Sequence, residues 1–397
     1  MPDRYCADRI SVFVVGRTLN EAVRCVKPPC KGAGVTTVGI GIIGCGKATQ
    51  ALHLPSLRQL PGKFRIVSLC DASASIARRV AESWAVGHWT IDTAELLSRP
   101  DIEAVLVANP NQFHARTATL ALATDKHVLL EKPAAMSIAE IDELIAAEQR
   151  SAAFVQVGYM RRFAPGFRLA QARLTEIGEI RVVRVHDLID AGLQLLSSTT
   201  VLVRDDNADG GALNLNQDES EPLRRALGTV PTPIQNAYQL LLRLGCHDLS
   251  TLRGIIGKPR RVLHAVERWN GAYLAATLDY GSFLCQFDVG LNIVAGTDIR
   301  IEVMGARGMM TLEYNMPYVR HRPARLTMSI VDGRGDVETY NHESQGKDQF
   351  LLEWEDFHAN ILARRKPDNS LQDARADLAI AMQIIDALET IKPTGID

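Results

Sequence analysis

The stretch VGIGIIGCGKAT, residues 38–49, decides the fold of this chain. Its apolar first half, Val38–Ile43, has the composition of a strand buried on both faces. Gly44, Gly46 and Thr49 follow in a G-x-G-x-x-T spacing, where the usual dinucleotide fingerprint has Gly or Ala last. The first glycine permits a tight turn, and the second lets an anion approach the backbone where a helix begins. Alone, the pattern also fits an ordinary strand-to-helix turn.

A second apolar run, FRIVSLCD, ends on Asp71, twenty-two residues after Thr49. An acid at this place can bind the ribose hydroxyls of a dinucleotide, whereas an Asp that only caps the next turn is the alternative. No cation occurs in residues 72–75, and a carboxylate repels a 2′-phosphate, so NAD(H) is favoured over NADP(H). The residues expected to bind the dinucleotide here are Gly44, Cys45, Gly46, Lys47, Ala48, Thr49 and Asp71.

The order of predicted strands and helices indicates two domains, preceded by an N-terminal extension at residues 1–36. This extension contains one possible strand, RISVFVVG. Over residues 37–157, the apolar runs EAVLVANP, HVLLEK and FVQVGY alternate with helical segments, which is typical of βαβ units and a parallel sheet. Over residues 158–397, strand-like runs from RVLHAVERW to MMTLEY follow one another without helices, which favours an antiparallel sheet. We expect a long polar loop at 187–236, a helix at about 238–256, and closing helices within 346–397.

Composition excludes several classes of protein. The formal net charge of −2 gives no electrostatic reason to expect nucleic acid or an anionic membrane as a partner. No apolar run approaches the roughly 18 residues of a membrane span. Seven scattered cysteines indicate reduced thiols in a cytoplasmic protein. Cys25 and Cys30 have no second ligand pair after them, so we expect no metal site.

The stretch HVLLEKPAA, residues 127–135, places a lysine where chemistry can occur. Ser137 and Glu140 form a capping box that starts the next helix. Glu131, Lys132 and Pro133 therefore lie in a loop at the carboxyl end of a parallel strand, where open α/β sheets bind ligands. The proline stiffens this loop. A lysine held near a nicotinamide suits proton transfer with a substrate oxygen, although a loop lysine can also be merely solvated.

The segments GIGIIGCGKAT, ANPNQFH, HVLLEKP, VGYMRRF and LGCHDL, in this order, resemble the Gfo/Idh/MocA oxidoreductase family. The resemblance covers roughly residues 37–395. It implies an α/β fold, with an N-terminal Rossmann domain and a C-terminal α/β domain that has a large open, mainly antiparallel sheet. It also implies a pyridine nucleotide, substrates with a ring hydroxyl or ketone, commonly sugars or cyclitols, and homodimers or homotetramers that often associate through the open sheet.

Residue by residue, the resemblance makes Lys132 the catalytic lysine and His247 the catalytic histidine. It places one loop beside the nicotinamide ribose, and Glu131 and Lys132 complete the cofactor site. The residues of that loop are Asn109, Pro110, Asn111 and His114. Tyr159 and Arg161 lie on the segment that enters the substrate cleft. Capping or packing is the alternative for His114 and Tyr159, and we interpret His53 as structural.

One departure from the family pattern concerns the substrate. Arg243 stands where the family often has Asp, four residues before the histidine, and Asn236–Tyr238 replace a glycine-rich run. Residues four apart share a helical face, so Arg243 and His247 should both face the cleft. The partner of Arg243 is then a protein acid, such as Asp248 or one in the segment NQDES, or an anionic or strongly hydrogen-bonding group of the substrate. A solvated side chain is the remaining alternative.

Together these features predict an NAD(H)-dependent oxidoreductase. A hydride would pass between the nicotinamide and the hydroxyl or ketone carbon of a sugar, cyclitol or nucleoside-sugar ring, with Lys132 and His247 as acid/base. A non-catalytic NAD-binding regulator of the same fold and an NAD-dependent glycosidase are the alternatives.

Overall fold

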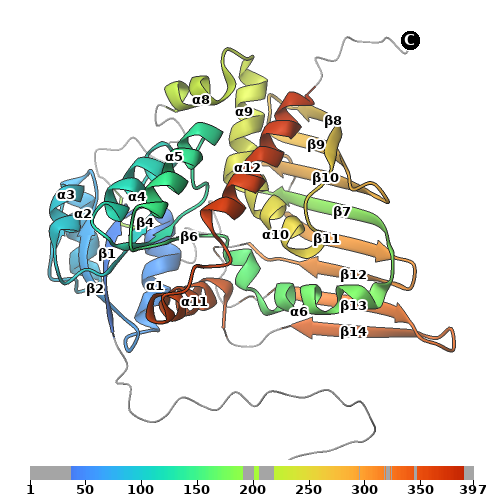
Figure 1. Ribbon diagram of the computed structural model, residues 1–397, viewed down its shortest axis with the longest axis horizontal. Helices are drawn as coiled ribbons and strands as arrows, with labels where there is room; N and C mark the ends of the chain where they lie inside the picture. Colours follow the sequence, from blue (N-terminus) through green and yellow to red (C-terminus); the bar gives the residue numbers. More distant parts are fainter. Residues whose placement is uncertain are drawn as a thin grey trace, which may run out of the picture. The chain divides into compact units, whose positions relative to one another are not determined.

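The computed structural model describes residues 37–190, 201–204, 219–294, 296–316, 318, 322, 324–343 and 347–388. The possible strand RISVFVVG lies outside the described residues. The described chain forms two sheets with helices packed on them (Figure 1). No helix in the described part of the chain is long and apolar enough to cross a membrane.

The first sheet is parallel and has six strands in the order β3-β2-β1-β4-β5-β6. Its strands are β1 (Val38–Ile43), β2 (Phe64–Cys70), β3 (Trp89–Thr90), β4 (Ala104–Val107), β5 (His127–Leu130) and β6 (Val155–Val157). Strand order reverses between β1 and β4, so the carboxyl ends of these two strands form the switch point at which such sheets bind ligands. The prediction of a Rossmann domain is confirmed.

Helices cover both faces of this sheet, which is why its central strands are apolar throughout. They are η1 (Thr49–His53), α1 (Leu54–Arg58), α2 (Ala74–Ser83), α3 (Thr93–Ser98), η2 (Asn111–Phe113), α4 (His114–Leu122) and α5 (Ile138–Gln149). Helix α5 starts as predicted, because the Glu140 N–H donates to Ser137 Oγ at 3.2 Å. The Glu140 carboxylate accepts from the Met136 N–H rather than from that of Ser137.

The second sheet has eight strands in the order β14-β13-β12-β11-β7-β10-β9-β8. Neighbouring strands are antiparallel except β7 and β10, so the predicted mainly antiparallel sheet is confirmed. The strands are β7 (Ile180–Ile189), β8 (Arg261–Arg268), β9 (Tyr273–Asp279), β10 (Leu284–Leu291), β11 (Thr297–Gly305), β12 (Gly308–Glu313), β13 (Arg325–Val331) and β14 (Val337–Glu343).

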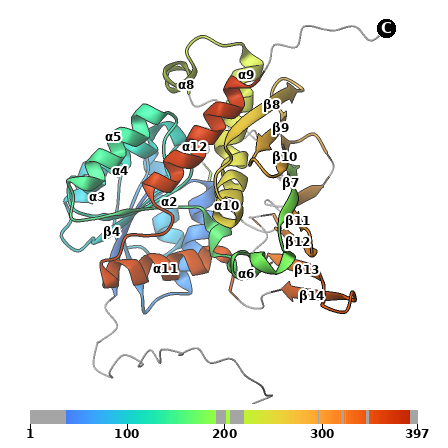
Figure 2. The ribbon, with the colours of Figure 1, turned by 45° about the vertical axis from the view of Figure 1, so that its right-hand side comes forward.

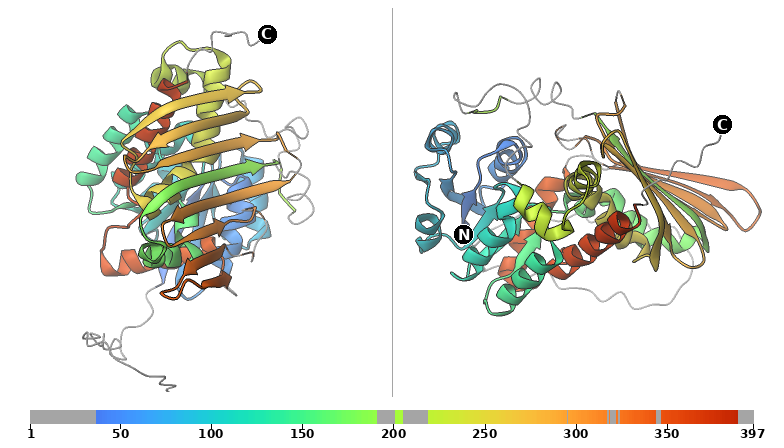
Figure 3. Two further views of the ribbon diagram at one scale, coloured as in Figure 1. Left: turned by 90° about the vertical axis from the view of Figure 1, so that its right-hand side faces the viewer. Right: turned by 90° about the horizontal axis from the view of Figure 1, so that it is seen from above.

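Helices cover one face of the second sheet, and its other face carries no helix of the described residues (Figures 2 and 3). The helices of this part are η3 (Met160–Phe163), α6 (Pro165–Arg173), η4 (Leu174–Ile177), α8 (Ser220–Leu227), α9 (Thr232–Leu240), η5 (Leu241–Gly245), α10 (Cys246–Ile256) and α12 (Leu371–Asp386). Residues alternate between buried and partly exposed along β9, as a sheet covered on one side requires.

Two predicted boundaries are wrong. The polar stretch 187–236 is not a continuous loop, because β7 runs to Ile189, α8 lies within the stretch, and α9 begins at Thr232 with Pro233 in its first turn. Helix α11 (Gln349–Ala363) does not close the second domain. Its Trp354 and Phe357 pack against Phe64 of β2, so α11 belongs to the core of the first domain and lies beside α1 (Figure 1).

Candidate active site

The turn after β1 has the geometry that a dinucleotide needs. Gly44 has φ +99°, and a Cβ there would lie 2.4 Å from the Ala108 carbonyl at the end of β4, so only glycine fits. A Cβ on Gly46 would meet nothing within 4 Å, so this glycine faces open space. The buried Thr49 hydroxyl donates to Gly44 O at 2.6 Å and ties the start of the helix to the turn. Threonine at this position is therefore compatible with the fingerprint.

Asp71 follows β2 and is bonded to the same turn. Its Oδ2 accepts from the Cys45 N–H at 2.8 Å, and its Oδ1 accepts from the Ser73 N–H at 2.9 Å. A carboxylate has about four lone-pair positions, so each oxygen can accept a further hydrogen bond from a ribose hydroxyl. The position beside the turn is compatible with ribose binding and with turn capping.

Residues 201–204 lie against the helix that follows this turn. The Gln50 amide donates to Val203 O at 3.0 Å and accepts from Val203 N at 2.8 Å, and Arg79 donates to Arg204 O at 2.9 Å. Burial, and then the charge of Arg204, lower the pKa of Lys47. No sequence signal could have predicted this contact, because the pairing residues are about 150 positions apart.

Lys132 follows β5 and is held from the second domain. Its Nζ donates to the Arg243 carbonyl at 2.6 Å, and the Lys132–Pro133 peptide is cis. Arg243 lies in the π-helical turn η5, between α9 and α10. A π-turn departs from the regular α-helical hydrogen-bond ladder and is frequent at functional sites. The lysine amine is thereby fixed beside the helix that carries His247.

Glu131 positions the lysine loop from the other side. The Trp354 indole N–H donates to His53 Nδ1 at 3.2 Å, so Nε2 of the neutral ring carries the proton and donates to Glu131 Oε1 at 2.8 Å. Glu131 Oε2 accepts from the Lys132 N–H at 3.1 Å. Although burial opposes ionisation, the His53 hydrogen bond and the charge of Lys132 hold the pKa of Glu131 below its ordinary value. The position of His53 between Trp354 and Glu131 is compatible with the structural role expected for it.

His114 joins the two loops at the carboxyl ends of β4 and β5. Its Nδ1 lies 2.7 Å from Pro133 O and its Nε2 lies 2.7 Å from Asn109 O. Burial lowers the pKa of His114, whereas the hydrogen bonds to these two carbonyls raise it. A backbone oxygen lies within hydrogen-bond distance of each ring nitrogen. These contacts are compatible with capping or packing, which was the alternative role for His114.

These loops surround a cavity of about 200 Å³ that includes residues from both domains. Its lining residues are Ala48, Leu52, Ala108, Asn109, Asn111, His114, Glu131, Lys132, Met160, His247, Tyr318 and Phe350. Burial first, and then the charges of Lys132 and Arg161, hold the pKa of His247 well below its ordinary value. Its buried Nδ1 has no hydrogen-bond partner in the described structure. A neutral imidazole there can donate to or accept from a ligand.

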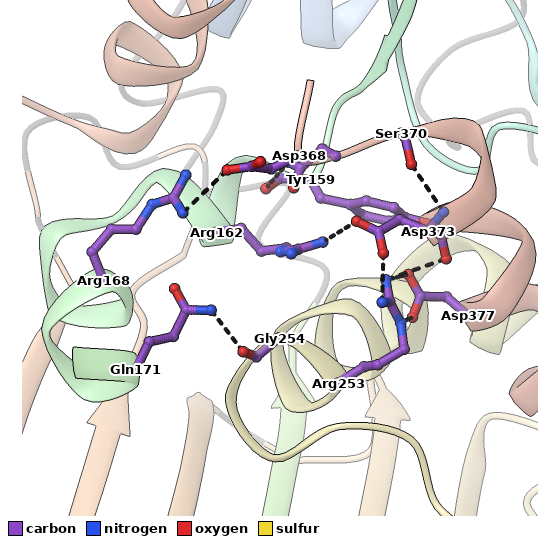
Figure 4. A network of polar contacts seen from close by, with 11 residues as sticks. Tyr159, Arg162, Arg168, Gln171, Arg253, Gly254, Asp368, Ser370, Asp373 and Asp377 are labelled. Atoms are coloured by element: carbon purple, nitrogen blue, oxygen red, sulfur yellow. Dashed lines mark hydrogen bonds and ion pairs between the residues drawn. The ribbon is translucent and has the colours of Figure 1, made fainter. Parts of the chain in front are cut away.

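Two residues predicted to enter the substrate cleft do not line this cavity. Arg161 is buried and forms ion pairs with Asp187 at 2.7 Å and Asp248 at 2.5 Å, because a buried guanidinium requires carboxylate partners. Tyr159 is buried next to residues of α5, η5 and α12, beside a network in which Arg253 binds Asp373 and Asp377 (Figure 4). Burial raises the pKa of Tyr159 well above its ordinary value.

Arg243 also differs from the prediction, because it reaches Lys132 through its backbone and not through its side chain. The Arg243 guanidinium binds Glu219 at 2.9 Å and lines a different cavity. Glu219 is one of the two acids of the segment NQDES, from which a protein partner of Arg243 was expected; the other expected partner, Asp248, binds Arg161. Because a protein carboxylate neutralises Arg243, an anionic substrate is not required.

The comparisons with known proteins agree with the fold. Residues 38–159 match the profile of an oxidoreductase family with an NAD-binding Rossmann fold, named GFO_IDH_MocA. This match covers the NAD-binding part of the chain and supports the resemblance to the Gfo/Idh/MocA family. Curated relatives bear the names of dehydrogenases or oxidoreductases, which is consistent with an NAD(P)-dependent dehydrogenase or reductase. No group of three or more potential metal ligands occurs among the residues that the structure describes.

The curated relatives are distant over the full length of the chain. An inositol 2-dehydrogenase of Salmonella typhimurium (strain LT2) is 24% identical over 365 residues, which are 87% of this chain and 93% of that protein. An inositol 2-dehydrogenase of Gluconacetobacter diazotrophicus is 38% identical, but over 37% of this chain and 44% of its own length. An uncharacterized oxidoreductase of Bacillus subtilis, YrbE, is 25% identical over 70% of this chain and 74% of its own.

Solved structures share the fold. Levoglucosan dehydrogenase in complex with NADH and levoglucosan aligns with a TM-score of 0.71 at 17% identity, over 89% of this chain and 97% of that chain. KijD10, a 3-ketoreductase from Actinomadura kijaniata in complex with NADP, aligns with a TM-score of 0.67 at 19% identity, over 89% and 98%. These likenesses support the two-domain architecture and leave the substrate open.

Proposed function

We propose that the protein is an NAD(H)-dependent oxidoreductase of a ring hydroxyl or ring ketone carbon in a sugar, cyclitol or nucleoside sugar. The observation that carries the proposal is the cavity in which Lys132 of the first domain and His247 of the second lie beside the dinucleotide turn. An amine and a neutral imidazole in one small cavity are suited to exchanging the proton of a substrate hydroxyl.

The bound nicotinamide supplies or accepts the hydride. In the oxidation direction, the substrate hydroxyl proton passes to the Lys132 amine while the electron pair of the O–H bond forms the carbonyl. In the reduction direction, the Lys132 ammonium returns that proton to the developing alkoxide. The Arg243 carbonyl fixes the position of Nζ, and His247 forms a hydrogen bond to the substrate oxygen. Asn109 and Asn111 line the cavity on the cofactor side.

NAD(H) is the proposed cofactor because Asp71 lies at the end of β2, beside the turn that would hold the pyrophosphate. A 2′-phosphate at this place would meet the carboxylate, and like charges repel. The relatives do not decide the point, since the solved structures that share the fold include complexes with NADP and with NADH.

A spectroscopic screen tests the proposed function. Purified protein is incubated with NAD or NADH and a panel of ring alcohols and ketones, and the reduced-nicotinamide absorbance is followed. We expect turnover of at least one sugar or cyclitol. Tight NAD binding without turnover of any compound would favour the non-catalytic regulator. Cleavage of a glycoside that needs NAD but causes no net change in absorbance would favour the glycosidase.

We also propose a homodimer or homotetramer formed through the face of the second sheet that carries no described helix, as the resemblance to the family implies. Side chains such as Val182, Leu284 and Met309 are partly exposed on its strands. Light scattering of the purified protein measures the mass, and a monomer at micromolar concentration would contradict this proposal.

A further inference from the structure

A second and larger cavity, of about 660 Å³, adjoins the helix that carries His247. It lies between α9, the turn from β8 to β9, and the end of β10. Its lining residues are Asn236, Gln239, Leu240, Arg243, Leu244, Trp269, Asn270, Gly271, Ala272, Leu291, Asn292 and Ile293. Pockets for small molecules typically have volumes of about 300–1,000 Å³, so this cavity has the size of a ligand site.

Both cavities have lining residues on the continuous helical segment formed by α9, η5 and α10. The Arg243 backbone carbonyl binds Lys132, and the Arg243 side chain lines the larger cavity. Four residues further on, about 6 Å along a helix axis, His247 lines the smaller cavity. An apolar cavity of about 150 Å³ holds one benzene ring, so the smaller cavity, at about 200 Å³, has no room for two linked sugar rings.

The wall of the larger cavity presents an aromatic ring to solvent on a constrained turn. Trp269 is 66% exposed and has φ +53°, a conformation that is uncommon for a bulky residue. The neighbouring Asn270 and Gly271 also have positive φ, and a Cβ on Gly271 would lie 2.4 Å from Pro233 O. The Asn236 amide fixes the turn by donating to Asn270 O at 2.9 Å. Backbone strain of this kind clusters at binding sites.

The polar groups of this cavity are uncharged or neutralised. Among the described residues of its lining, Arg243 is the one that carries a charge, and the buried Glu219 carboxylate pairs with it. The side-chain amide nitrogen of Gln239 donates to the same carboxylate at 2.8 Å, and that of Asn236 donates to Asn270 O. The amide oxygens of Asn236 and Gln239 can therefore accept hydrogen bonds from hydroxyl groups. An aromatic face combined with amide acceptors suits a ring with an apolar face and a hydroxylated edge.

We propose that the larger cavity binds a second, uncharged sugar ring, so that the substrate is a glycoside whose first ring reacts at Lys132. The second ring stacks on Trp269 and donates its hydroxyl protons to Asn236 and Gln239. The inference rests on the proposed function for its first ring. A nucleotide diphosphate does not fit this lining, because its anionic groups would meet no unpaired cation there.

The kinetic test compares glucose, its disaccharides cellobiose and maltose, and UDP-glucose, each with NAD, in the wild type and in Trp269→Ala. In the wild type we expect kcat/KM for one disaccharide to exceed that for glucose by at least about tenfold, which corresponds to about 1.4 kcal/mol. Trp269→Ala should reduce this ratio toward one, whereas Trp269→Phe retains most of it. Trp89→Ala, an exposed tryptophan on β3, is the control and should leave the ratio unchanged.

A binding measurement separates failure of this inference from failure of the proposed function. Disaccharides are titrated into the NAD-loaded protein, and tryptophan fluorescence is followed in the wild type and in Trp269→Phe. A change that is saturable in the wild type and absent in Trp269→Phe supports the second ring site even if no sugar is oxidised. Equal kcat/KM for glucose and both disaccharides without such a change, a preference for UDP-glucose, or an equal disaccharide-to-glucose ratio in Trp269→Ala would overturn it.

Discussion

At the scale of single residues, the position of Lys132 depends on two side chains that do not line the cavity, those of His53 and Trp354. Trp354 binds His53, His53 binds Glu131, and Glu131 accepts from the Lys132 backbone. The capping box and the loop at the end of β5 could be predicted from the sequence, because both are local patterns. The Trp354–His53 contact joins residues 301 positions apart, and no local pattern encodes it.

This chain of contacts makes His53 a positioning residue. His53→Leu removes the hydrogen bond to Glu131 and should lower kcat by up to about 10²-fold, since a displacement of about 1 Å at a reacting group can cost that much. The KM for substrate and the Kd for NAD should change little, because His53 does not line the cavity. His53→Gln, which keeps an N–H donor, should restore part of kcat. An unchanged kcat in His53→Leu would show that the contact does not position Lys132.

Asp71 is expected to determine the preference for NAD(H) over NADP(H). The wild type should bind NAD(H) at least about tenfold more tightly than NADP(H), or about 1.4 kcal/mol. Asp71→Ser should reduce that preference, because the repulsion of a 2′-phosphate is removed. Asp92→Ser is a matched control, since Asp92 only caps α3 through the Ala94 N–H. Equal affinity of the wild type for both cofactors, measured by calorimetry, would place Asp71 outside the ribose site.

At the scale of secondary-structure elements, prediction succeeded where the pattern of apolar residues was local. Five strands of the first domain, β1, β2, β4, β5 and β6, and the strands β7 to β12 could be expected from periodicity and turn residues, whereas the two-residue strand β3 was not expected. The polar helix α8 could not, because its solvent-facing sequence resembles a loop, and β14 is exposed along most of its length. The place of Arg161 also depends on tertiary structure, since its carboxylate partners come from β7 and α10.

The ion pairs of Arg161 hold three elements together, η3, β7 and α10. Arg161→Met leaves the buried Asp187 and Asp248 carboxylates without their cation, and removing one partner of a buried pair costs about 3–5 kcal/mol. We expect a clear fall in the free energy of unfolding, measured with urea. Arg181→Met, which breaks an exposed pair with Glu179, should cost about 0–1 kcal/mol. If the Arg161→Met protein were as stable as the wild type and had a raised KM, the result would indicate that Arg161 contacts the substrate.

Helix α11 carries a carboxyl group that should make stability depend on pH. Glu353 is fully buried, and neither of its oxygens has a hydrogen-bond partner in the described structure. Burial first, and then the charges of Glu131 and Asp356, raise the pKa of Glu353 well above its ordinary value. The folded protein therefore keeps a proton that the unfolded chain loses above about pH 4.3. Stability from this group is present at low pH and is lost as pH rises toward the folded-state pKa.

Glu353→Gln removes this dependence while keeping the size of the side chain. The variant should gain stability relative to the wild type between pH 5 and pH 8, as measured by urea unfolding at both pH values. Glu355→Gln, on the same helix but partly exposed, controls for general effects on α11. A difference between Glu353→Gln and wild type that stays constant over this range would show that Glu353 is ionised in the folded state.

At the scale of the whole molecule, the proposed chemistry requires both domains. Lys132 belongs to the parallel sheet, whereas His247 and the Arg243 carbonyl that binds Lys132 come from the second domain. The resemblance of short motifs to a known family predicted that the lysine and the histidine would meet. An acid of the segment NQDES was among the partners expected for Arg243, but the sequence could not show that binding Glu219 would turn the Arg243 side chain away from the cavity that His247 lines.

The most direct test of the account is the rate of hydride transfer in Lys132→Ala, measured by nicotinamide absorbance with a sugar or cyclitol that the wild type oxidises. General acid–base groups contribute about 10²–10⁴-fold, so turnover should fall by that factor while the Kd for NAD stays nearly unchanged. Lys63→Ala, which removes a partly exposed lysine outside the cavity, should retain wild-type turnover. Near-normal turnover in Lys132→Ala would contradict the central claim and remove the lysine from the mechanism.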